Sequence, residues 1–115
     1  MKEDECHYLV VGAGTSGMSF IDTLLTENPN SSVILVDRNE KPGGHWTTSY
    51  PFVKLHQHSC FYGVNSVKLG KAIDRKGNEV FDYDDRATGA EVVEYYGNVL
   101  KKIQNQSKIQ SLLQM

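Results

Sequence analysis

Six residues near the start of the chain have the types and the spacing of a phosphate-binding turn. They form a Gly-x-Gly-x-x-Gly motif, called the glycine loop below: Gly12, Ala13, Gly14, Thr15, Ser16 and Gly17. The first glycine of such a motif permits a tight turn, the second lets the backbone approach a pyrophosphate, and the third lets a helix pack closely on a strand. The hydroxyl groups of Thr15 and Ser16 either add contacts to a phosphate or belong only to the first helical turn.

An acidic residue stands where a dinucleotide-binding fold needs one. Asp37 comes 20 residues after Gly17 and directly follows an apolar run. An acid at this place accepts hydrogen bonds from ribose hydroxyls, and its charge repels a 2′-phosphate, which disfavours NADP here. The neighbouring Arg38 either attracts phosphate charge or is a solvated surface residue.

The apolar pattern predicts the elements that hold these residues. Residues 8–11 and 33–36 are short, continuous apolar runs, which are typical of strands buried on both faces. Between them, apolar residues recur at three- and four-residue spacing and predict a helix over residues 16–27. Strand, helix and strand form a βαβ unit with a right-handed crossover. The sequence therefore predicts an α/β, Rossmann-like fold with the glycine loop at the opening of its first helix.

The remainder of the chain is less regular. Residues 38–66 lack a clean period but are rich in aromatic residues, which indicates a long excursion packed on a ligand or on a neighbouring layer. Residues 67–83 are consistent with a hairpin. Thr88 and Glu91 fit a capping box that opens a helix over residues 89–104. We expect the polar tail, residues 104–115, to extend this helix or to fray.

A second glycine motif restricts the choice of cofactor. Asp37 and Arg38 are soon followed by a Gly-Gly-x-Trp segment, made of Gly43, Gly44, His45 and Trp46, and then by Tyr50-Pro51. Here the chain resembles the flavoprotein monooxygenases of the flavin-containing and Baeyer-Villiger type, within the superfamily that has two dinucleotide-binding domains, for FAD and NAD(P). The resemblance covers about residues 7–65. It implies that the glycine loop and Asp37 bind the ADP half of FAD and that the Gly-Gly-x-Trp segment closes over the cofactor.

The resemblance departs from the Baeyer-Villiger pattern after Tyr50-Pro51. That pattern continues with an arginine and an aspartate, where this chain has Lys54 and His56. The reaction subtype is therefore left open, and no residue of the chain is identified as catalytic.

His56, His58 and Cys60 suggest a different kind of site. Alternation along a strand would place the three side chains on one face, and histidine and cysteine are ligands of zinc and iron. The spacing lacks a close cysteine pair, and a fourth ligand is not evident. Local packing or contact with the flavin is the favoured interpretation, and no metal site is predicted.

Composition restricts the class of protein. The chain has 115 residues, with 12 Lys and Arg against 14 Asp and Glu, so it lacks the positive charge of a general nucleic-acid binder. No apolar run approaches the roughly 20 residues of a membrane-spanning helix, and the first seven residues do not form a secretory signal. Two cysteines fit a reducing compartment, so we expect a cytoplasmic protein without membrane or nucleic-acid partners.

The predicted sheet is smaller than a dinucleotide-binding fold requires. Such a fold has five or six parallel strands, whereas the pattern indicates two, and no further Gly-x-Gly-x-x-Gly motif follows residue 17. We expect residues 1–115 to be a single, partial FAD-binding domain whose sheet is completed by a missing C-terminal region or by a second chain. The predicted function is that of the FAD-binding N-terminal portion of a flavin- and NAD(P)H-dependent monooxygenase-like oxidoreductase, with NADPH bound only through a missing second domain. The alternatives are a non-catalytic NAD- or FAD-binding module and an inactive truncated product.

Overall fold

The computed structural model of the chain describes residues 6–70, 72–73, 76, 79–80, 85–106 and 109–113. Its elements, in chain order, are β1 (Tyr8–Val11), α1 (Thr15–Glu27), β2 (Val33–Asp37), the 3-10 turns η1 (Gly44–Thr48) and η2 (Ser59–Phe61), β3 (Ala72–Ile73), β4 (Glu79–Val80), α2 (Gly89–Gln106) and β5 (Ile109–Leu113). None of the helices in these ranges is long and apolar enough to cross a membrane.

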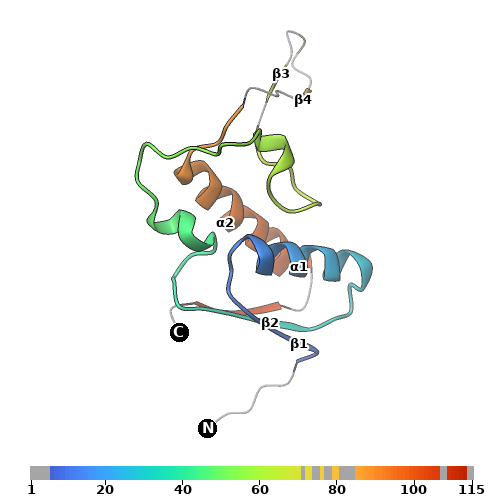
Figure 1. Ribbon diagram of the computed structural model, residues 1–115. Helices are drawn as coiled ribbons and strands as arrows, with labels where there is room; N and C mark the ends of the chain where they lie inside the picture. The colour runs from blue at the N-terminus through green and yellow to red at the C-terminus, as the bar shows by residue number, and fades with distance from the viewer. Residues whose placement is uncertain are drawn as a thin grey trace.

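A parallel sheet forms the base of the molecule. Its strand order is β1-β2-β5, with Val11 opposite Val36 and Val36 opposite Leu112. Both α1 and α2 lie on the same side of this sheet (Figure 1). This arrangement follows from two successive right-handed crossovers that move in the same direction across the sheet. The α/β, Rossmann-like fold is therefore confirmed.

The burial of β1 differs from the prediction. A strand buried on both faces was expected, but Leu9 is 62% exposed and Val11 is 78% exposed. Val10, whose side chain points the other way, packs against the core. The prediction is wrong because β1 pairs only with β2 among the described strands, and the two helices cover one side of the sheet only.

Residues 109–113 form a strand, contrary to the expectation for residues 104–115. Helix α2 ends at Gln106, and β5 then pairs in parallel with β2. The physical reason is that α2 returns the chain to the second edge of β2, whose backbone groups then pair with those of β5. The predicted hairpin is present as β3 and β4, which are antiparallel, while residues 75, 77 and 78 of its turn lie outside the described residues.

The core lies between the sheet and the helices. Its largest fully buried apolar side chains come from α1, β2 and α2, namely Met18, Ile21, Val33, Leu35, Val92, Tyr96 and Val99. The excursion over residues 38–66 packs against the start of α2, which is a neighbouring layer and one of the two expected arrangements. The backbone N–H of Leu55 donates to the carbonyl of Ala87 at 2.9 Å, and that of Gly89 donates to the carbonyl of Val53 at 3.1 Å.

Candidate functional site

Two positions of the glycine loop require glycine, Gly12 for its backbone conformation and Gly17 for lack of space. Gly12 has a φ of 104°, and its N–H donates to the carbonyl of Val36 at 2.7 Å. A Cβ atom on Gly17 would lie 2.0 Å from the carbonyl oxygen of Gly12. The first and third glycines of the motif are therefore required for the turn and for the close approach of α1 to β1.

The N-terminus of α1 has no cap of its own. Gly14 is the N-cap residue, no side chain bonds there, and the first turn holds no acidic residue. The first backbone bond across this end runs from Met18 to Gly14 at 3.0 Å, so the N–H groups of residues 15–17 have no acceptor among the described residues. Unpaired N–H groups and the positive end of the helix dipole together favour an anionic ligand.

The N-terminus of α2, unlike that of α1, is capped by side chains. There the Thr88 hydroxyl accepts from the N–H of Glu91 at 3.2 Å, and the Glu91 carboxylate accepts from the N–H of Thr88 at 3.3 Å. The capping box expected from the sequence is thus formed. Of the two helices, it is α1 whose first N–H groups remain available to a ligand.

Asp37 holds the glycine loop in place. Its side chain is only 9% exposed, and Oδ2 accepts a hydrogen bond from the backbone N–H of Ala13 at 2.6 Å. Oδ1 accepts from the N–H of Asn39 at 2.7 Å. A carboxylate has about four acceptor positions, so these two bonds leave capacity for the hydroxyls of a ribose.

The Gly-Gly-x-Trp segment lies directly on the glycine loop. The N–H of Gly43 donates to the carbonyl of Ala13 at 2.8 Å, and a Cβ on Gly44 would lie 3.1 Å from the Cα of Gly14. Gly43 and Gly44 both have positive φ, 129° and 60°. The fold therefore brings together the glycine loop, Asp37 and the Gly-Gly-x-Trp segment, which the sequence analysis assigns to one cofactor.

Three of the predicted binding residues are less enclosed. Arg38, Ser16 and His45 are exposed, although the His45 ring lies 5.2 Å from the half-buried ring of Trp46. Trp46 also borders a groove of about 770 Å³ between residues 41–51 and α2. Neither the glycine loop nor Asp37 lines this groove. One side of Trp46 faces the groove, and its indole N–H points toward the interior, where it donates to Tyr62.

Two tyrosines that the sequence analysis did not assign to the site contact it. The Tyr62 hydroxyl lies 2.5 Å from Thr15 Oγ1 and accepts a bond from Trp46 Nε1 at 2.9 Å. The Tyr96 hydroxyl donates to Thr15 Oγ1 at 2.9 Å. Burial raises the pKa of Tyr96 above its usual value. These tyrosines are 47 and 81 residues from Thr15, and no spacing rule connects them to it.

The histidines of residues 56–60 do not form the strand that the metal interpretation requires. His56 is exposed, and η2 begins at Ser59, so the alternation expected along a strand does not occur. The side chain of Cys60 lies outside the described residues. Across the described ranges, no group of three or more His, Cys, Asp or Glu side chains is placed to hold a metal ion. Lys54 is also exposed and forms a backbone bridge with Thr88.

Comparison with known sequences supports the assignment of the fold. The family model of the NAD(P)-binding Rossmann-like domain matches residues 10–83. An uncharacterized protein of Mycobacterium tuberculosis (strain ATCC 25618 / H37Rv) is 48% identical over 103 residues, which are 88% of this chain and 19% of that protein. An uncharacterized protein of Mycobacterium bovis matches equally well. The chain thus spans about a fifth of the length of these relatives.

Solved structures with a similar fold are monooxygenases. A flavin-containing monooxygenase from Stenotrophomonas maltophilia has a TM-score of 0.68 at 18% identity, over 94% of this chain and 28% of that one. A cyclohexanone monooxygenase mutant from Rhodococcus sp. Phi1, bound to NADP+, has a TM-score of 0.60 at 21% identity, over 92% and 19%. At these identities the likeness shows a shared fold, which agrees with the resemblance seen in the sequence.

Proposed function

The chain belongs to the NAD(P)-binding Rossmann-like domain family, and on that premise we propose that it binds FAD as the N-terminal part of a flavin- and NAD(P)H-dependent monooxygenase-like oxidoreductase. The observation that carries this proposal is the meeting of three features at Ala13 and Gly14. They are the uncapped N-terminus of α1, the carboxylate of Asp37 and the Gly-Gly-x-Trp segment. A plain NAD-binding fold has no need of the third.

Each feature has a role in the proposed complex. The N–H groups of residues 15–17 would hold the pyrophosphate, and the free acceptor positions of Asp37 would bind the adenosine ribose. Gly43 and Gly44 would cover the cofactor from the opposite side, because they already lie against Ala13 and Gly14. FAD, when bound, supplies the redox chemistry, and the chain supplies position and shielding from water.

The proposal places the rest of the reaction outside these residues. The chain contains one Gly-x-Gly-x-x-Gly motif, which the proposal assigns to FAD, so NADPH would bind through a second domain. The edge of β1 that has no partner among the described strands would likewise pair with a strand from a longer form of the chain or from a second chain. The greater length of the mycobacterial relatives supports a strand from a longer form of the chain. The low cysteine content supports a cytoplasmic location.

Titration of the purified chain with FAD tests the proposal through a matched pair of variants. Gly14 has a φ of −82° and a Cβ there would lie 3.5 Å from the Cα of Gly44, so Gly14→Ala is expected to fold. The added methyl group would occupy space that the pyrophosphate needs, and FAD affinity should fall roughly tenfold or more. Gly97→Ala is the control, because a Cβ on Gly97 meets nothing within 4 Å.

The result separates the proposed function from its alternatives. The wild-type chain and Gly97→Ala should bind FAD equally and turn yellow, while Gly14→Ala keeps its circular dichroism spectrum and loses affinity. Tighter binding of NAD+ than of FAD, with the same sensitivity to Gly14→Ala, would instead identify an NAD-binding module. A folded chain that binds neither would contradict the proposal.

A further inference from the structure

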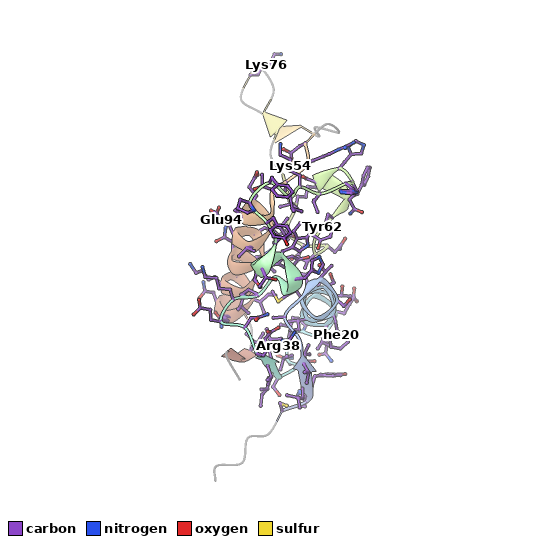
Figure 2. The ribbon with its side chains drawn as sticks, turned by 60° about the vertical axis from the view of Figure 1, so that its left-hand side comes forward. Phe20, Arg38, Lys54, Tyr62, Lys76 and Glu94 are labelled. Atoms are coloured by element: carbon purple, nitrogen blue, oxygen red, sulfur yellow. The ribbon has the colours of Figure 1, made fainter. Side chains whose placement is uncertain are left out.

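Four aromatic rings form one continuous path of contacts through the protein. The path runs from Trp46 of η1 to Tyr62, then to Tyr96 of α2, and ends at Tyr95. Neighbouring ring centroids lie 6.3 Å, 6.4 Å and 5.1 Å apart, and each ring meets the next edge-on. In Figure 2, Tyr62 lies beside the ribbon of α2 and above that of α1. The path therefore connects the Gly-Gly-x-Trp segment to the buried side of α2.

Hydrogen bonds join three of these rings as well. Trp46 donates through Nε1 to the Tyr62 hydroxyl at 2.9 Å. The hydroxyls of Tyr62 and Tyr96 bond to each other, and both are bonded to Thr15 Oγ1. The Tyr62 hydroxyl thus touches the indole of Trp46 on one side and two hydroxyl oxygens on the other. A proton that leaves Tyr62 has these two oxygens as its first acceptors.

The path has one end at the surface and the other in the core. One side of Trp46 faces the groove between residues 41–51 and α2, whereas Tyr96 is fully buried. Tryptophan and tyrosine are among the side chains that lose one electron most easily, and the two need similar oxidation potentials. Of the four rings, a small oxidant that enters the groove reaches Trp46 first. Tyr62 is the next ring from which an electron can be drawn.

We propose that Tyr62 returns Trp46 to its reduced state after a one-electron oxidant has attacked Trp46 from the groove. The oxidant is an inorganic radical, which takes one electron from the Trp46 ring. Trp46 then takes one electron from Tyr62, and the hydroxyl proton of Tyr62 leaves through the adjacent hydroxyls to water. For each radical reduced, one O–H bond of Tyr62 breaks and one proton is released. Trp46 is regenerated, and a neutral tyrosyl radical remains in the path.

Pulse radiolysis of the purified chain in azide solution tests this transfer. The azide radical oxidises tryptophan in preference to tyrosine at neutral pH, and Trp46 is the single tryptophan of the chain. The absorbance of the Trp46 radical should decay while that of a tyrosyl radical rises, at one common rate that is independent of protein concentration. Tyr62→Phe keeps the ring but has no hydroxyl proton to lose. In this variant the Trp46 radical should persist severalfold longer.

Tyr50→Phe is the matched control. Tyr50 borders the same groove and is 70% exposed, but its ring stacks on Phe52 at 5.6 Å. This variant should leave the lifetime of the Trp46 radical unchanged, and circular dichroism checks that both variants are folded. A measurement of the wild-type chain in D2O needs no substitution. The transfer should be slower there, because an O–H bond breaks in the step.

Several results would overturn the inference. They are equal lifetimes of the Trp46 radical in the wild type and in folded Tyr62→Phe, a lifetime that depends on Tyr50, and the absence of a solvent isotope effect. Decay of the Trp46 radical without a rise in tyrosyl absorbance would also contradict it, because the electron would then come from another group, such as a thiol. FAD takes no part in this measurement, so each of these results leaves the proposed function as it stands.

Discussion

Asp37 stabilises the fold as well as offering acceptor positions to a ligand. The sequence predicts only the second role, because an acid at the end of the second strand is typical of ribose binding. In the structure, each carboxylate oxygen accepts a backbone N–H, from Ala13 and from Asn39. The residue that would bind the ribose therefore also sets the shape of the turn that would bind the pyrophosphate.

Asp37→Ala should consequently have two measurable effects. Loss of the ribose hydrogen bonds should weaken FAD by about 1.5 to 3 kcal/mol, and loss of a partner for two N–H groups should lower the free energy of unfolding by about 1 to 3 kcal/mol. FAD titration measures the first effect, and urea unfolding of the ligand-free chain measures the second. Asp37→Asn keeps one oxygen acceptor, so its FAD affinity and its free energy of unfolding should lie between those of the wild type and of Asp37→Ala. An Asp37→Ala chain that binds FAD normally but has lost NAD+ would show that the FAD assignment is wrong.

Residues that belong to motifs could be predicted as members of the candidate site, and the others could not. Gly12, Gly17 and Asp37 are recognisable because a phosphate-binding turn needs particular residue types at fixed spacing. Tyr62 and Tyr96 reach the same place only through the packing of the long excursion and of α2 on α1. Their positions depend on tertiary structure, for which a single sequence has no local signal.

At the scale of elements, periodicity predicts those that pack one face against a core. Helices α1 and α2 and strand β2 are found within one or two residues of the expected bounds, because the apolar residues of the helices repeat with the helical period and those of β2 form one continuous run. Strand β5 was missed because Gln110 and Ser111 interrupt its apolar residues, and because its pairing partner β2 is distant in sequence. The burial of β1 was misjudged because an apolar run does not reveal what covers it.

The same substitution should have opposite effects in the two helices. A Cβ on Gly97 of α2 meets nothing within 4 Å, so Gly97→Ala should raise the free energy of unfolding by about 0.5 to 1 kcal/mol through helix propensity. A Cβ on Gly17 of α1 would lie 2.0 Å from a backbone oxygen, so Gly17→Ala should destabilise by about 1 to 3 kcal/mol or more. Thermal unfolding of the two variants measures the difference. Equal effects would mean that α1 can move away from β1 at little cost.

At the scale of the whole molecule, the two α-helices that the structure describes cover one side of the sheet. Both helices pack on the same face, and they leave Leu9 and Val11 exposed on β1 (Figure 1). The outer edge of β1 has no partner among the described strands. An apolar strand with an open edge is a typical site of pairing with another chain.

Self-association through β1 is therefore expected when the 115-residue chain is purified alone. Sedimentation or size-exclusion measurements should show association that increases with concentration in the micromolar range. Val11→Lys should shift the chain toward monomer and change its stability by no more than about 0.5 kcal/mol, because Val11 is 78% exposed and a charge on an edge strand opposes pairing. Val10→Lys is the opposing control, since Val10 packs against the core and a lysine there should unfold the chain. A wild-type chain that stays monomeric at high concentration would show that the edge of β1 is protected without a further strand.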